Sequence, residues 1–108
     1  EIPAGKIDLD EDPKKCAYRE LEEETGYKAK KLTLLTSFYP AIGFANEKIW
    51  IYLAKNLVKS NSNTDKDEFV ETISVDLNIA LDMVAQGMIK DSKTIIGLMW
   101  LDKYLKNE

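Results

Sequence analysis

Glu20, Glu23 and Glu24 are the residues of this chain best suited to chemistry. On a helix that turns about 100° per residue, their spacing brings all three carboxylates onto one face, within roughly a quarter of the circumference. Carboxylates this close repel one another, and a hard divalent cation such as Mg²⁺ cancels that repulsion because it prefers oxygen ligands. Mg²⁺ usually completes its shell with water and substrate phosphate, so the cluster indicates a metal site acting on a phosphate compound. A solvated acidic helix face is the alternative.

The residues around these glutamates predict the helix that carries them. Asp12 is a suitable N-cap, Pro13 suits the first helical position, and Gly26 suits the residue just past the end. Between them, residues 14–25 contain neither Gly nor Pro and are rich in good helix formers. We therefore expect one helix here, with Cys16 as a small buried residue.

The composition excludes several other kinds of active site. The 108 residues include no His and one Cys, which excludes a zinc site of the usual nitrogen and sulfur type, a Ser-His-Asp triad and an internal disulfide. The net charge of -4 argues against non-specific nucleic-acid binding and agrees with an anionic substrate bridged by a metal. With no long apolar run and no signal peptide at its start, the chain is expected to be one soluble, cytoplasmic domain without membrane contact.

Hydrophobic periodicity predicts the elements beyond the first helix. Alternating apolar and polar residues indicate half-buried strands at 32–39, 48–55 and 69–75. Helices are expected from 77 to 86 and after Asp91. Helices that flank a mixed sheet indicate an α/β sandwich.

The stretch from Gly5 to Tyr27 resembles the Nudix box. The family pattern is Gly, five residues, Glu, seven residues, then Arg-Glu-apolar-any-Glu-Glu-any-Gly-apolar. It is filled here in register by Gly5, Glu11, Arg19, Glu20, Leu21, Glu23, Glu24, Gly26 and Tyr27. A chance match in a chain this long has odds on the order of one in ten million. The resemblance implies an α/β/α sandwich with a mixed sheet, and hydrolysis of a nucleoside diphosphate linked to a further group by means of divalent metals and an attacking water.

Roles for individual residues follow from this resemblance. Glu20 and Glu24 match the principal metal ligands, Glu23 adds a third carboxylate, and the carbonyl of Ala4 matches a backbone ligand. Arg19 is expected to orient the glutamates by ion pairing. Glu24, Glu23 and Arg19 are thus the candidate catalytic residues of the box, with Mg²⁺ as the expected cofactor and Mn²⁺ as a possible substitute.

The remaining box positions are expected to act through the backbone or the loop. Gly5 suits a turn out of a strand, and Gly26 suits the end of the helix. Glu11 is expected to hydrogen-bond its own loop, and added negative charge near the metal is the alternative.

Segments outside the box resemble the ADP-ribose pyrophosphatase subgroup of the family. They comprise residues 1–6, 38–47 and 89–94. The resemblance implies ADP-ribose or a related nucleoside diphosphate sugar as the substrate. Ile42 stands where the subgroup usually has a proline, so hydrolysis of coenzyme A or of a dinucleoside polyphosphate stays open. The candidate substrate contacts in this region are Gly43, Phe44 and Glu47.

The general base is expected in the polar loop 60–68, because in this subgroup it comes from a mobile acidic loop after the long strands. Glu68 aligns best with the catalytic acid of relatives, and Asp67 and Glu71 are the alternatives. An ordinary solvated loop is the competing interpretation.

The aromatic residues divide into two groups. Trp50, Tyr52 and Trp100 have the spacing of strand or helix faces and are expected in the core or at a dimer contact rather than as platforms that stack adenine. Phe38 and Tyr39 flank a turn and, like Phe44, are better candidates for substrate contact.

The resemblance also bears on the extent of the protein. Relatives place several strands before the box, so residues 1–108 are expected to be the C-terminal portion of a Nudix hydrolase domain, with open strand edges and exposed apolar surface. A homodimer is implied as well. The alternative function is a nucleotide-sensing Nudix domain without turnover, although such domains often lose the box glutamates that this chain retains.

Overall fold

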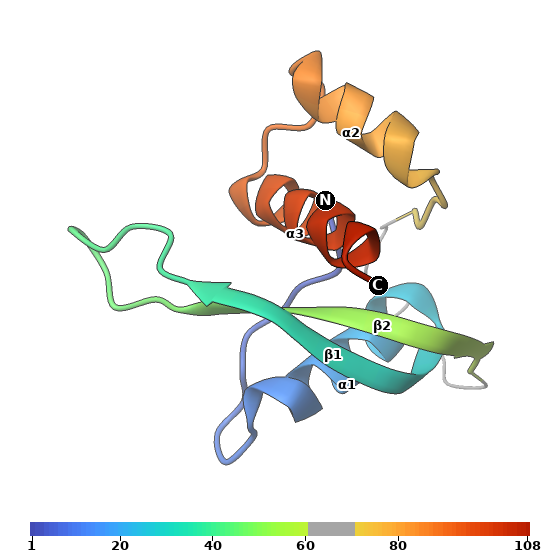
Figure 1. Ribbon diagram of the computed structural model, residues 1–108. Helices are drawn as coiled ribbons and strands as arrows, with labels where there is room; N and C mark the ends of the chain where they lie inside the picture. The colour runs from blue at the N-terminus through green and yellow to red at the C-terminus, as the bar shows by residue number, and fades with distance from the viewer. Residues whose placement is uncertain (61–70) are drawn as a thin grey trace. The chain divides into compact units, whose positions relative to one another are not determined.

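The computed structural model describes residues 1–60 and 71–108. The element order is α1 (Pro13–Thr25), β1 (Tyr27–Phe38), β2 (Ile49–Lys59), α2 (Leu77–Ala85) and α3 (Ser92–Lys106), and the two strands pair in an antiparallel sheet (Figure 1). Within this part of the chain no helix is both long and apolar enough to cross a membrane.

The chain forms two compact units. The first unit contains Glu1–Ile2, Leu34–Ile51 and Ser74–Glu108, and the second contains Pro3–Thr33 and Tyr52–Ile73. Helix α1 therefore belongs to the second unit, whereas α2 and α3 belong to the first.

Helix α1 begins and ends where its sequence predicts. Asp12 caps it by accepting a hydrogen bond from the Lys15 amide at 2.8 Å, and Pro13 occupies the first turn. Gly26 ends it with φ of 75°, in the left-handed region that favours glycine, and its N–H donates to the Glu22 carbonyl. Cys16 is buried, as predicted.

Both strands are longer than predicted. Strand β1 starts at Tyr27 rather than at residue 32, and β2 continues to Lys59. The early part of β1 is rich in lysine, and its alternation breaks at Lys31, but backbone pairing with β2 requires no apolar side chains. The Ser60 amide donates to the Gly26 carbonyl at 2.8 Å beyond the ends of the two strands.

The strand predicted at 69–75 is wrong for its described part. Residues 71–75 form no strand, and Phe69 and Val70 lie outside the described residues. Ile73 is 70% exposed and Val75 is 41% exposed. Alternation predicts a strand only where one face is buried against a partner, and these side chains have no such cover.

In the first unit, α2 packs against α3, and both helices agree with prediction to within a residue or two. Asp76 and Asp91 cap their N-termini through side-chain oxygens. Gly97 of α3 is buried, and a Cβ on it would make an ordinary van der Waals contact of 3.6 Å with Ile51 Cγ2 of β2, so α3 lies directly against this strand.

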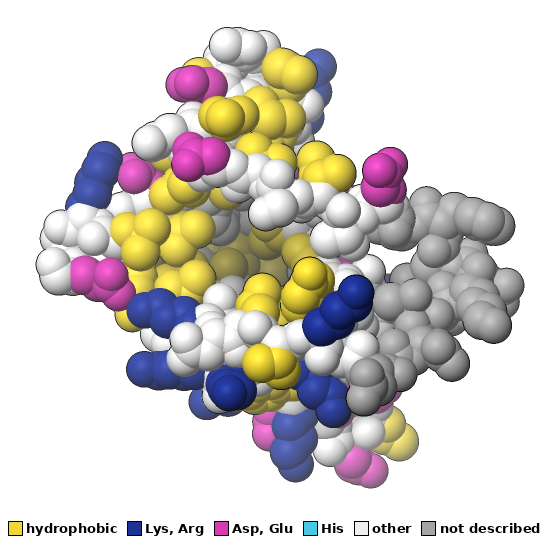
Figure 2. Space-filling view, turned by 90° about the vertical axis from the view of Figure 1, so that its right-hand side faces the viewer, with side chains coloured by type: hydrophobic (Ala, Val, Ile, Leu, Met, Phe, Trp, Pro, Cys, Tyr) yellow, Lys and Arg dark blue, Asp and Glu magenta, His cyan; other side chains and the backbone are white. Residues whose placement is uncertain are grey.

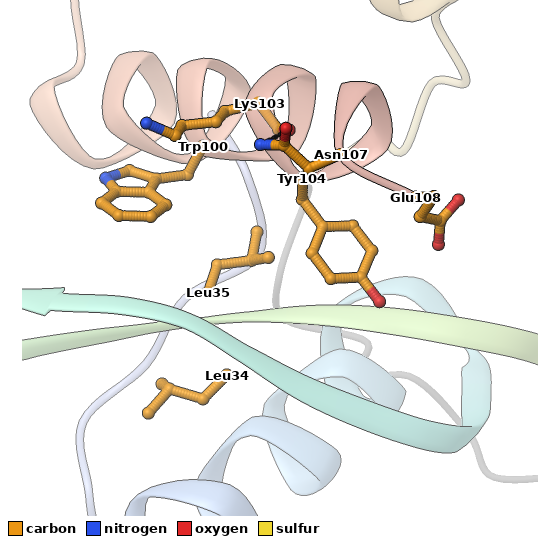
Figure 3. A pocket seen from close by; sticks show the side chains of 7 residues that line it. All are labelled: Leu34, Leu35, Trp100, Lys103, Tyr104, Asn107 and Glu108. Carbon is orange, nitrogen blue, oxygen red and sulfur yellow. Dashed lines mark hydrogen bonds between the residues drawn. The ribbon is translucent and has the colours of Figure 1, made fainter.

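Much apolar surface is open to solvent in the described residues. The buried apolar side chains there are Cys16, Leu32, Ile51 and Ala80. Figure 2 shows many hydrophobic side chains at the surface of the face that it displays. In the first unit, Leu35 of β1 points toward Trp100 and Tyr104 of α3 across a pocket of about 400 Å³ (Figure 3). Trp100, which was expected in the core or at a dimer contact, is 42% exposed and is therefore only partly covered.

Candidate metal and catalytic site

Arg19 forms ion pairs with several acidic residues of the box in the second unit. Its Nη1 lies 2.8 Å from Glu20 Oε1 and 3.2 Å from Glu23 Oε2, so it pairs with two of the glutamates that it was expected to orient. On the other side, Nε and Nη2 form a two-pronged pair with Glu11 at 2.8 and 3.0 Å. Asp8 adds a longer contact of 3.4 Å. The planar guanidinium can bind several carboxylates at once, which a lysine ammonium cannot do in the same geometry.

Glu11 ties Arg19 to the loop before α1. Its Oε1 accepts a hydrogen bond from the Asp8 amide at 2.9 Å while both oxygens bind Arg19. The hydrogen bond from Arg19, supported by that from the Asp8 amide, lowers the pKa of Glu11 to about 2. The loop hydrogen bond predicted for Glu11 is therefore present.

Glu20 and Glu24 both contact the backbone at Ala4 and Gly5. Oε2 of Glu24 accepts a hydrogen bond from the Ala4 amide at 3.1 Å. The carboxyl group of Glu20 occupies the space that a side chain on Gly5 would fill. Gly5 thus serves close approach, and its conformation is not the left-handed one of Gly26. The two principal ligand candidates converge on the segment whose carbonyl was matched to a backbone ligand.

Cys16 lies beneath this segment and is not a candidate nucleophile. Its thiol contacts the Gly5 carbonyl at 3.9 Å and Arg19 Nη2 at 3.8 Å. Burial, followed by the negative charge of Glu11, raises the pKa of the Cys16 thiol. A thiol that stays protonated at neutral pH is a poor nucleophile and a poor metal ligand.

The donor set fits a hard divalent cation, but these side chains are held by protein partners. Glu20, Glu23 and Glu24 offer oxygen ligands alone, which is the chemistry that Mg²⁺ prefers. Within residues 1–60 and 71–108, no three acidic or cysteine side chains are arranged around a common metal position. The contacts above explain this, since Arg19 binds Glu20 and Glu23 while Glu24 binds the Ala4 amide.

The predicted general base falls at the edge of what the structure describes. Glu68 and Asp67 lie outside the described residues. Glu71 is described, exposed and in irregular structure. The Thr72 hydroxyl donates to the Glu24 carbonyl at 3.4 Å, so the chain leaving the acidic loop returns to the end of α1 that carries the box glutamates.

The predicted substrate contacts lie between β1 and β2, in the first unit. Phe44 is 97% exposed, Glu47 is exposed, and nothing lies within 4 Å of a Cβ placed on Gly43. Because they belong to a different unit from α1, their use in one site with the glutamates stays a prediction.

Sequence reasoning missed several polar and charged contacts. Asp8 occupies an unspecified position of the box pattern, and only its place in the loop between Gly5 and Glu11 could have suggested its contact with Arg19. Ser60 hydrogen-bonds the Glu22 carboxylate, on the side of α1 away from the metal candidates. Lys48 lies 5.2 Å from the ring centre of Trp50 and 5.7 Å from that of Tyr39, a cation–π cluster that alternation along a strand suggests only weakly.

Comparison with known proteins gives concordant results. Residues 1–95 match the family model of the NUDIX domain. The chain is 47% identical over 103 residues to the ADP-ribose pyrophosphatase of Bacillus subtilis (strain 168), and equally identical over the same length to the methanol dehydrogenase activator of Bacillus methanolicus. Each alignment covers 94% of this chain and 56% of the relative, so the chain spans little more than half the length of these relatives.

A solved crystal structure supports the fold assignment. The fold resembles that of an ADP compounds hydrolase with a TM-score of 0.84 and 26% sequence identity. The superposition covers 95% of this chain and 56% of that one. The predicted α/β class is thereby confirmed, and the described antiparallel strand pair with its helices is consistent with part of that fold.

Proposed function

Because the chain belongs to the Nudix family, we propose that it carries the metal-binding and catalytic part of a Mg²⁺-dependent hydrolase of nucleoside diphosphate compounds. ADP-ribose or a related nucleoside diphosphate sugar is the proposed substrate, and AMP and ribose 5-phosphate are the products expected from ADP-ribose. The likeness to the B. subtilis ADP-ribose pyrophosphatase supports this choice. The protein is proposed to act in the cytoplasm as a homodimer.

The convergence of Glu20 and Glu24 on Ala4 and Gly5 carries the proposal. The two carboxylates come from successive turns of α1 and meet one backbone segment. If this acidic face of α1 served only solubility, its carboxylates would be expected to point into solvent rather than inward against a glycine. The arrangement therefore favours a ligand site over a solvated surface.

The chain's own residues divide the work as follows. Glu20, Glu23, Glu24 and the Ala4 carbonyl would hold the cation, which when bound neutralises phosphoryl charge and lowers the pKa of the attacking water. Arg19 keeps Glu20 and Glu23 oriented through its ion pairs. Glu68 is proposed to accept the proton of the attacking water, with Asp67 and Glu71 as alternatives.

The experiment is Mg²⁺-dependent release of AMP from ADP-ribose by the complete natural protein, with other nucleoside diphosphate sugars, coenzyme A and dinucleoside polyphosphates assayed in parallel. Glu24→Gln should lower turnover about a hundredfold or more, because a charged ligand contributes several kcal/mol in such sites. Glu22→Gln is the matched control, since Glu22 lies on the same helix but binds Ser60 and Lys28. Equal losses in both variants would count against a metal site on the Glu24 face.

A second candidate is favoured by the likeness to the methanol dehydrogenase activator. In that case the chain would bind a nucleotide and act on a partner protein. A nucleotide-binding measurement on the same panel separates the two, because binding without hydrolysis of any compound would support the partner-directed function.

A further inference from the structure

The connection between β1 and β2 is tied at its base by Lys48. The Nζ of Lys48 lies 5.7 Å from the centre of the Tyr39 ring and 5.2 Å from that of the Trp50 ring. Both distances are within the roughly 6 Å over which a cation attracts an aromatic face. Tyr39 directly follows β1, and Lys48 directly precedes β2. The contact with Tyr39 therefore joins the two stems of the loop 40–47 at the point where both strands end.

The contact with Trp50 fixes this lysine to the sheet. Trp50 lies two residues after Lys48, so in an extended chain the two side chains point to the same side. Trp50 is partly buried and belongs to a strand that is paired with β1. The Lys48 ammonium thus connects a ring that is fixed on the sheet with a ring at the start of the loop.

Lys48 is not engaged in an ion pair within residues 1–60 and 71–108, where its ammonium contacts these two rings and no carboxylate. The residue is exposed, so its side chain has room to extend into water, as a lysine that served only solubility would. Its ammonium instead lies over both rings. Because the position is exposed, replacing Lys48 removes the two contacts without leaving a buried cavity.

The tip of the loop forms a turn of its own but has little side-chain cover. The Phe44 and Ala45 amides both donate to the Ala41 carbonyl at 2.9 Å. Ile42 is 81% exposed and Phe44 is 97% exposed, so neither side chain packs on the described part of the protein. Figure 1 shows this connection reaching well beyond the ends of β1 and β2. Without packing at the tip, the direction in which the turn points depends on its two stems.

We propose that Lys48 is a positioning residue, which holds the stems of this loop together and so restricts how Gly43, Phe44 and Glu47 are presented to the substrate. The proposal rests on the proposed function in that it takes these three residues as substrate contacts. All of the residues involved belong to the first unit. A loop that is ordered before binding loses less conformational freedom when the substrate binds, so the restraint should favour substrate affinity rather than the chemical step.

The test combines steady-state hydrolysis of ADP-ribose by the complete natural protein with amide hydrogen exchange. Lys48→Met keeps an unbranched apolar side chain but removes the charge. It should raise KM about three- to tenfold, as expected for the loss of two exposed cation–π contacts, and leave kcat within about twofold of the wild type. Exchange of the Phe44 and Ala45 amides should become faster by a similar factor, because their turn is less restrained once its stems can separate.

Two substitutions at the same position and at another lysine serve as controls. Lys48→Arg keeps a cation that binds aromatic faces, so it should restore both KM and amide exchange to within about twofold of the wild type. Lys106→Met removes a lysine of the same unit that pairs with Asp102 rather than with a ring. It changes the net charge as Lys48→Met does and should leave both measurements unchanged.

A change on the other stem separates a restraint on the loop from direct contact between Lys48 and the substrate. Tyr39→Leu removes the ring that Lys48 contacts across the loop, and it should raise KM and speed amide exchange in the same way. In the double variant, Lys48→Met should add less than its separate effect, because both changes break the same contact.

The proposal is overturned if Lys48→Met leaves KM and amide exchange at their wild-type values, or if Lys106→Met changes them equally. A higher KM with unchanged exchange also overturns it, as do fully additive effects of Lys48→Met and Tyr39→Leu, because these patterns indicate separate contacts with the substrate. The proposed function fails separately, when the wild type hydrolyses no nucleoside diphosphate compound although Lys48→Met speeds exchange. In that case the restraint on the loop is supported and its role in substrate binding is overturned.

Discussion

Replacing Gly5 by alanine should separate the activity of this protein from its stability. A Cβ on Gly5 would lie 2.5 Å from Glu20 Cγ and closer still to the carboxyl group, whereas ordinary contact begins at 3.4 Å. The Glu20 side chain must therefore retreat by about 1 Å, and misplacement on this scale in a catalytic site costs about a hundredfold in rate.

The cost in stability should be small by comparison. Retreat of Glu20 breaks its 2.8 Å pair with Arg19, where the side chains are 18% and 28% exposed. Partly exposed pairs of this kind contribute about 0.2–1 kcal/mol. Alanine also loses less conformational freedom on folding than glycine, which stabilises the folded state by about 0.4–1 kcal/mol. The free energy of unfolding should thus change by less than about 1 kcal/mol.

The assay pairs release of AMP from ADP-ribose with urea unfolding of the same preparation. Gly43→Ala is the matched control for unfolding, because nothing lies within 4 Å of a Cβ at that position. Glu20→Asp in the Gly5→Ala background shortens the obstructed side chain and should recover part of the activity, so the two changes should not be additive. Activity within threefold of the wild type in Gly5→Ala would refute the reasoning.

Two further predictions concern proton chemistry. Glu68→Gln should lower turnover by about two to four orders of magnitude with Mn²⁺ affinity nearly unchanged, as for a general base that is not a ligand; unchanged turnover in steady-state kinetics would exclude Glu68. The pKa of Glu11 is lowered from 4.5 to about 2 by Arg19 and the Asp8 amide, so its contribution to stability is present above pH 4.5 and is lost as the pH falls toward 2. The urea midpoint of Glu11→Gln should accordingly depend less on pH than that of the wild type over this range, and parallel profiles would contradict the assignment.

Local signals in the sequence predicted the helices well. Asp12 and Asp91 cap the starts of α1 and α3, and the glycine after α1 ends that helix. Each signal acts only on the neighbouring one or two turns, so no knowledge of the fold was needed to predict these helix ends. Strands depend on partners elsewhere in the chain. The lysine-rich start of β1 was therefore not predicted as a strand, and the alternation at residues 71–75 led to a strand prediction that is wrong.

Sequence spacing placed the box glutamates on one helix, but it could not say what each carboxylate binds. Glu20 and Glu24 differ by one turn, and only the structure assigns the first to Arg19 and Gly5 and the second to the Ala4 amide. A contact of the 89–94 segment was equally hidden, because the Thr94 hydroxyl accepts a hydrogen bond from the Ile2 amide, 92 positions away along the chain. Contacts over such separations depend on tertiary packing, which composition and periodicity do not encode locally.

The contacts of Arg19 give a physical reason for the fixed spacing of the box. Glu11 reaches Arg19 from the loop, and Glu20 and Glu23 reach it from the helix, so one guanidinium offsets part of the repulsion among these three carboxylates. Without such a partner, mutual repulsion would tend to spread the carboxylates apart whenever no cation was bound. Binding of a cation would then exchange one positive partner for another at Glu20 and Glu23, while Glu11 keeps Arg19 in place. An insertion between Glu11 and Arg19 should therefore disturb the site even with every glutamate retained.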